Sequence, residues 1–150
     1  IVSIFFGPVY FNTNPVFVAV SRVSTNTGKH TARTGSSAYF GPDSTLNRSA
    51  RVWGNPTNAR TDLVALLLAL EAAPKTKTLC VSTWSEYAIR SINYHAFRNA
   101  VCGWTCTIGD VMKSIIQGIT ARSAPVHLVH IKKDEIHAHF IAAKGLAETA

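Results

Sequence analysis

TNARTDLVALLLALEAAPKTKTLCVSTWSEYAIRS, residues 57 to 91, is the stretch around which the rest of this chain is organised. Its first half predicts a helix, because leucines recur at the i, i+3, i+4 and i+7 positions of one face. These leucines are Leu63, Leu66, Leu67 and Leu70. Ala73-Pro74 is a suitable end for the helix, since the residue before a proline disfavours helical dihedral angles. Asp62 lies one turn before Leu66 and is therefore expected at the edge of the buried stripe.

The second half predicts a short buried strand that opens directly onto another helix. Residues 78 to 83 read TLCVST and place β-branched residues and leucine around Cys80, with no charge among them. The strand ends on Trp84. Ser85 can then cap a helix that runs through Ile92, because a serine hydroxyl accepts hydrogen bonds from the free amides of the first helical turn.

This order of helix, strand and helix resembles the centre of the ribonuclease H family. In that family the corresponding segments are similar to TN-x-RAEL-x-ALLLALE and TDSEY, which supply a Glu and an Asp that bind Mg²⁺. Here the segments read TNARTDL at residues 57 to 63 and STWSEY at residues 82 to 87. The resemblance therefore implies the family scaffold, with Asp62 and Trp84 at two metal-binding positions.

The residues before this stretch resemble the first three strands of the same family. Residues 17 to 20 predict a buried strand, and VSRVSTNTGK, residues 20 to 29, stands where the family carries TDGS-x-x-N-x-G at the end of that strand. Counting back from Gly28 places the family's first metal-binding Asp on Ser21. ARTGSSAYFGP, residues 32 to 42, and LNRSARVW, residues 46 to 53, resemble the second and third strands.

The residues after it resemble the rest of the family fold. NYHAFRNAVCGWTC, residues 93 to 106, is similar to the substrate-binding handle of eukaryotic-type enzymes, with Trp104 in the Gly-Trp position. Asp110 is expected to cap a helix whose buried face contains Val111, Ile115 and Ile119. Residues 124 to 131 predict the last strand. KKDEIHAHFIAAKGLA, residues 132 to 147, aligns without a gap to the family's C-terminal segment, and places its last metal-binding carboxylate on Lys144.

The resemblance implies an α/β protein of the ribonuclease H-like fold, with a five-stranded mixed sheet flanked by helices. Three of these strands are antiparallel and the last two are parallel. We expect residues 17 to 150 to form one domain, and residues 1 to 16 to be an N-terminal extension that adds a strand or straps the core. The sequence begins without Met, so the true N-terminus is expected to lie upstream.

The composition favours a polyanionic partner. The net charge is +7 and the pI about 9.7, which suggests nucleic acid. No run of about 18 apolar residues occurs, so no membrane span is predicted. The cysteines, Cys80, Cys102 and Cys106, are odd in number and lack CxxC spacing, so a zinc site is not expected. They favour an intracellular protein, while the compartment and the oligomeric state stay undetermined.

The resemblance implies that hydrolysis uses two Mg²⁺ ions about 4 Å apart, held between four carboxylates. At those positions this chain has Ser21, Asp62, Trp84 and Lys144, and the family's mobile-loop histidine falls on Asp134. Asp62 is the surviving acid. We therefore expect no bound metal, and Asp62 as the ligand if Mg²⁺ binds after all.

Other readings of these residues stay open. Asp62 can be a helix N-terminal carboxylate or the ion-pair partner of Lys144, which would then act as a tethered cation in place of the metal. A rebuilt metal site would use other acids and histidines of the chain, which are Glu86, Asp134, Glu135, His137 and His139. The simpler interpretation of His137 and His139 is that they are solvated loop histidines.

Substrate binding is a separate question from cleavage. Asn26, Thr57 and Asn58 match family positions that hold the backbone and minor groove of an RNA/DNA hybrid, and Trp104 matches one that packs on sugars. Thr57 and Asn58 have an alternative as helix caps, and Trp104 as a core aromatic residue. The family's phosphate-binding arginine is replaced by Asn55, which removes a bidentate contact and predicts weaker binding.

We therefore expect a ribonuclease H-like, catalytically inactive or impaired protein that binds RNA/DNA hybrid or duplex RNA. One alternative is an active, Mg²⁺-dependent RNA/DNA-hybrid endoribonuclease with a rebuilt site. Another is a protein-interaction module on the same scaffold, with the apolar residues 1 to 14 as its contact.

Overall fold

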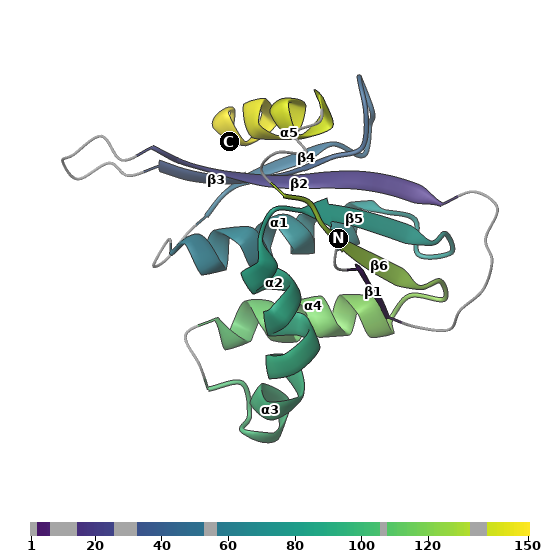
Figure 1. Cartoon of the computed structure of the whole chain (residues 1–150), viewed down its shortest axis with the longest axis vertical. Helices are drawn as coiled ribbons and strands as arrows, with labels where there is room; N and C mark the ends of the chain where they lie inside the picture. Colours follow the sequence, from purple (N-terminus) through teal and green to yellow (C-terminus); the bar gives the residue numbers. More distant parts are fainter. Residues whose placement is uncertain (1–2, 7–14, 26–32, 53–56, 106–107, 133–137) are drawn as a thin grey trace.

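The computed structural model describes residues 3–6, 15–25, 33–52, 57–105, 108–132 and 138–150, which form one mixed sheet with helices on both faces (Figure 1). The strand order is β1-β6-β5-β2-β3-β4. Neighbouring strands β2, β3 and β4 are antiparallel, and β2, β5 and β6 are parallel. The strands are β1 (Ser3–Phe6), β2 (Val16–Thr25), β3 (Arg33–Tyr39), β4 (Arg48–Arg51), β5 (Leu79–Thr83) and β6 (Val126–His130).

The predicted five-stranded core, three antiparallel strands followed by two parallel ones, is confirmed by β2 to β6. The sheet itself has six strands, because β1 pairs antiparallel with the edge strand β6 in the register Ser3↔Val129 to Phe6↔Val126. Of the two forms expected for residues 1 to 16, the described part adopts the extra strand. It covers backbone groups on β6 that would otherwise be an open edge.

Helices cover both faces of the sheet. Figure 1 shows α5 on one face, α1 and α4 on the other, and α2 and α3 projecting away from the sheet. The consecutive helical segments α2, η1 and α3 extend the helix that was expected to end at Ile92, and η1 is a π-helical turn. The helical segments are α1 (Asn58–Ala72), α2 (Glu86–Arg90), η1 (Ser91–His95), α3 (Ala96–Val101), α4 (Gly109–Thr120) and α5 (Ala138–Glu148). Within the described residues, none of these helices is long and apolar enough to cross a bilayer.

The leucine stripe of α1 forms the centre of the main core. Leu63, Leu66 and Leu70 are buried and Leu67 is half-buried at the margin, as the spacing predicted. Strand residues and α4 complete this core, including Val81, Met112, Ile115 and Leu128. A second, smaller core lies under α5 and contains Ala19, Ile131, Phe140 and Ala143.

Of the four residues that the sequence offered as helix caps, Thr57 and Ser85 cap helices, and Asn58 and Asp110 do not. Thr57 Oγ1 accepts a hydrogen bond from the Arg60 amide and caps α1, and Ser85 Oγ accepts from the Ala88 amide and caps α2. The expectation for Asp110 was wrong, because Ile108 occupies the N-cap position of α4. Asp110 lies in the first turn and instead binds Arg60 of α1 through two hydrogen bonds of 3.0 and 2.7 Å.

Two neighbouring serines on β3 attach the sheet to the helices on opposite faces. Ser36 Oγ donates to the Thr61 carbonyl of α1 at 2.7 Å, and Ser37 Oγ donates to the Ala143 carbonyl of α5 at 2.5 Å. Both serines are fully buried. Because side chains alternate between the faces of a strand, two consecutive hydroxyls can hold two helices.

The close approach of α5 to β3 also requires Gly35. A Cβ added at Gly35 would collide with the carbonyl oxygen of Ala147, whereas one added at Gly145 of α5 would meet open space. We expect Gly35→Ala to lower the free energy of unfolding by about 2–3 kcal/mol through overpacking. The matched change Gly145→Ala should leave it unchanged or raise it by up to about 1 kcal/mol, since alanine favours a helix over glycine. Urea denaturation followed by circular dichroism measures both, and equal stability of Gly35→Ala and wild type would contradict this packing.

Candidate active site

The four positions that the resemblance assigns to metal ligands lie around one pocket. Ser21 comes from β2, Asp62 from the first turns of α1, Trp84 from the end of β5 and Lys144 from α5. The pocket has a volume of about 450 Å³ and is lined by Val20, Ser21, Arg22, Val23, Ser24, Asp62, Thr83, Trp84, Ser85 and Lys144. Four positions that are far apart in the sequence therefore come together in space.

The alternation of β2 decides which helix each of its residues faces. Ser21 pairs with Ser37, which bonds to α5, and Arg22 pairs with Ser36, which bonds to α1. Directly opposed residues of an antiparallel pair share a face. Ser21 therefore lies on the α5 side of the sheet and Arg22 on the α1 side. The first strand was expected to end near Ser21, but β2 continues to Thr25, because β3 pairs with it over the whole of this length.

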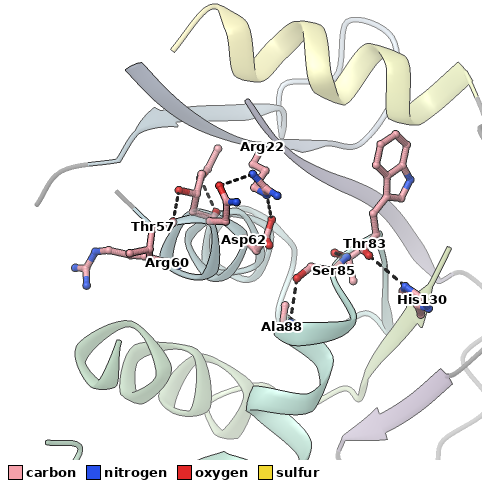
Figure 2. Close-up of polar contacts among 12 residues, drawn as sticks. Arg22, Thr57, Arg60, Asp62, Thr83, Ser85, Ala88 and His130 are labelled. Atoms are coloured by element: carbon pink, nitrogen blue, oxygen red, sulfur yellow. Dashed lines mark hydrogen bonds and ion pairs between the residues drawn. The ribbon is translucent and has the colours of Figure 1, made fainter. Parts of the chain in front are cut away.

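Asp62 forms an ion pair with Arg22, not with Lys144. Figure 2 shows the Arg22 guanidinium reaching from β2 toward Asp62, with Nε 2.8 Å from Asp62 Oδ1. Arg22 Nη1 also donates to Asn58 Oδ1 at 2.7 Å. The hypothesis of an Asp62–Lys144 pair is thus wrong, because Lys144 belongs to the helix on the other face. Lys144 is exposed and forms no ion pair with any described residue.

The environment of Asp62 has opposing effects on its acidity. Burial raises the pKa of the Asp62 carboxyl above its ordinary value. The charge of Arg22 and hydrogen bonds from Ser85 and Arg22 lower this pKa. The effect of burial is larger, so the pKa of Asp62 is raised overall. The Asp62 side chain is 16% exposed and that of Arg22 is 35% exposed. Arg22 therefore offsets only part of the cost of placing this carboxylate in the pocket wall.

Trp84 is held at the end of β5 by the groups around it. Its ring lies against Phe140 of α5, with ring centroids 5.3 Å apart and an interplanar angle of 34°. Its carbonyl oxygen hydrogen bonds to His130 Nε2 at 3.1 Å, and the Ser85 amide donates to Thr83 Oγ1 at 3.1 Å (Figure 2). An aromatic ring thus stands where the family has a carboxylate, and contributes packing to α5 instead of an acceptor oxygen.

Of the other residues that the sequence suggested for the site, some lie beside this pocket and others lie elsewhere. Thr57 caps α1, and Asn58 accepts from Arg22 beside the pocket. Trp104 lies apart from the pocket, between α3 and α4, where it is half-buried against the main core with a φ of 59°. His139 is exposed and its ring lies 6.1 Å from that of Tyr39. Predictions for Asn26, Asn55, Asp134, Glu135 and His137 fall outside the described residues.

The donor set of the pocket does not fit two Mg²⁺ ions. Mg²⁺ requires hard oxygen ligands, usually carboxylates, and the pocket offers one carboxylate that is already paired with an arginine. A hydroxyl, an indole and an ammonium stand at the other three positions that the resemblance assigns. Among the residues that the structure describes, no three His, Cys, Asp or Glu side chains are grouped in a way that could hold a metal ion.

Sequence reasoning missed Arg22. The family motif TDGS has a glycine at this position, and the arginine directly follows Ser21 in VSRVST. The signal was available in the alternation of the strand: if Val20 faces the α1 core, Arg22 must point the same way. What the sequence did not supply was the register that brings Arg22 opposite Asp62.

The fold and the converging positions define a ribonuclease H-like domain. The sequence profile of the RNase H family matches residues 22–145, and the chain belongs to this family. A comparison with curated protein sequences gave no match.

Solved structures with this fold include two of the foamy viral protease-reverse transcriptase. One is in complex with dsDNA, with a TM-score of 0.70 and 15% identity over 91% of this chain and 97% of that chain. The other is in complex with RNA/DNA hybrid, with a TM-score of 0.72 and 15% identity over 96% of this chain and 21% of that chain. A third is LC9-RNase H1, a type 1 RNase H with the type 2 active-site motif, with a TM-score of 0.65 and 18% identity over 93% of this chain and 74% of that chain.

The ion pair makes a prediction for the acidity of Asp62. Arg22→Met removes the charge and the hydrogen bond by which Arg22 lowers the pKa of Asp62. The pKa of Asp62 should therefore rise further. An NMR titration of the Asp62 carboxyl carbon measures this pKa directly. An aspartate with a raised folded-state pKa keeps its proton in the folded state after the unfolded state has lost it. Stability therefore falls as the pH rises from the ordinary carboxyl range through the folded pKa, and in the variant this window extends to higher pH.

At neutral pH we expect Arg22→Met to lower the free energy of unfolding by about 1–2 kcal/mol, between the values for exposed and fully buried pairs. Arg90→Met is the matched control, since it breaks the exposed pair between Arg90 and Glu86 and should cost about 0.5 kcal/mol or less. An unchanged pKa of Asp62 in Arg22→Met would show that the pair does not form.

Proposed function

We propose that this chain is a nucleic-acid-binding member of the ribonuclease H family that is inactive or strongly impaired in hydrolysis, with RNA/DNA hybrid or duplex RNA as its partner. The observation that carries the proposal is the Arg22–Asp62 ion pair in the pocket where the family positions converge. The surviving acid of the site has a cation of the protein as its partner, in the place where catalysis would need a metal ion.

The electrostatics of the pocket argue against two-metal hydrolysis. The pocket wall contains two cations, Arg22 and Lys144, and one carboxylate, Asp62, so it has a surplus of one positive charge. The family site, in contrast, contains four carboxylates. Two unit charges about 4 Å apart interact by about 4 kcal/mol at an effective dielectric constant of about 20, and a divalent ion doubles this repulsion. The pocket therefore disfavours the ions that would have to activate water.

The surface next to the pocket favours binding of a polyanion. Trp84, just after β5, and Tyr87, in the first turn of α2, are 39% and 47% exposed. Tyr87 also lines a second pocket, of about 410 Å³, together with Ser91, His95, Arg98, Asn99, Ile108 and Met112. Exposed aromatic rings interleaved with cationic side chains suit nucleic acid, because bases or sugars can stack while phosphates are neutralised. The net charge of +7 acts in the same direction.

Exposed apolar groups on the α5 side keep a protein partner as the second candidate. Phe17 is 67% exposed and lies on the face of β2 that α5 covers only in part, and Ile141 of α5 is 66% exposed. A protein interface centred on these residues would depend little on salt, in contrast to phosphate contacts.

The test is incubation of a labelled RNA/DNA hybrid with the protein in Mg²⁺ and in Mn²⁺, followed by a binding titration. We expect no cleavage by wild type, and binding by fluorescence anisotropy that weakens about tenfold or more between 50 and 200 mM salt. Asp62→Asn is the control for a contaminating nuclease. Cleavage that disappears in Asp62→Asn would overturn the loss of hydrolysis, and the absence of binding at low salt would overturn the nucleic-acid partner.

A further inference from the structure

We infer that the pocket between β2, α1 and α5 binds a phosphate group directly, through Lys144 and Arg22 and without a metal ion. This inference rests on the proposed function and names the ligand chemistry of its central site. It assigns the two cations a binding role that the family gives to Mg²⁺.

The first argument is the unpaired charge. Lys144 lines the pocket from α5, is exposed, and has no acidic partner among the residues that the structure describes. The Asp62 carboxylate of the same pocket is already paired with Arg22. The pocket thus carries a surplus of one positive charge, which matches a phosphodiester, with one negative charge, better than it matches a neutral ligand or a cation.

The second argument is the supply of hydrogen-bond donors. Arg22 uses Nε for Asp62 and one hydrogen of Nη1 for Asn58. A guanidinium has five N–H donors, and the Nη2 group makes no hydrogen bond to any residue of the described ranges. Ion pairing with Asp62 therefore orients Arg22 and still leaves N–H groups for a second acceptor, in the fork geometry that suits phosphate oxygens.

The third argument is the hydroxyl groups in the same wall. Ser21 and Ser24 line the pocket from β2, and Thr83 from β5. The oxygen of Thr83 accepts from the Ser85 amide, which leaves its O–H as a donor. Phosphate oxygens accept such bonds, whereas a metal would need the oxygens of charged acids. A volume of about 450 Å³ leaves room for a phosphate with its flanking sugars.

The experiment measures binding of a labelled RNA/DNA hybrid in EDTA and in Mg²⁺. Lys144→Met removes the surplus charge and keeps the apolar stem of an exposed side chain, so the fold should be preserved, which circular dichroism checks. We expect it to weaken binding about tenfold and to reduce the slope of log Kd against log salt by about 1. Lys113→Met, an exposed lysine of α4 that does not line the pocket, should change the affinity less than twofold. Wild-type affinity should be undiminished in EDTA.

Inorganic phosphate is the second probe and separates the two proposals. In ¹H–¹⁵N spectra it should shift the resonances of Ser21, Arg22 and Lys144 in wild type, and those of Ser21 and Arg22 should stay unshifted in Lys144→Met. If the hybrid binds but Lys144→Met behaves like Lys113→Met, the phosphate site is wrong and the proposed function stands. If phosphate shifts these resonances but no hybrid binds, the site takes free phosphate and the proposed function fails. Binding that is lost in EDTA would overturn a metal-independent site.

Discussion

The buried hydroxyls of Ser36 and Ser37 fix the geometry on which the pocket depends. Each donates to a carbonyl inside a helix, one on either face of the sheet, at Thr61 of α1 and Ala143 of α5. The next residues along these helices are Asp62 and Lys144. A strand that contributes no side chain to the pocket therefore determines where two of its key residues lie. A buried hydroxyl without its acceptor is costly, so these contacts hold the helices at a defined height along β3.

The side chains of Arg22 and Trp84 have partners beside the pocket, outside the main core. The Trp84 ring packs on Phe140, and Arg22 pairs with Asp62. None of these contacts involves the leucine stripe of α1, whose residues are buried against the sheet and α4. The leucine stripe that builds the main core is thus separate from the residues that line the pocket.

Local patterns in the sequence predicted local structure, whereas contacts between distant segments could not be predicted from them. The periodicity of α1, its end before Pro74 and the cap at Ser85 are local properties, and all were correct. The family motifs supplied the strand order. What the sequence did not supply concerns pairing between distant segments: which strand β1 pairs with, the length of β2, and the meeting of Arg22 with Asp62 across 40 positions of sequence. Register between elements sets these contacts, and no local pattern encodes it.

The change in charge alters what the pocket can bind as well as what it can catalyse. Four carboxylates repel phosphates, so a family enzyme needs metal ions both to hold the substrate and to activate water. In this chain the resemblance places Ser21, Trp84 and Lys144 at three of these positions, and Asp62, at the fourth, is paired with Arg22. In the proposed site, attraction to phosphate comes from Arg22 and Lys144 of the protein and not from metal ions. Binding without hydrolysis, as proposed for this chain, would therefore follow from a single change in the charge of the pocket.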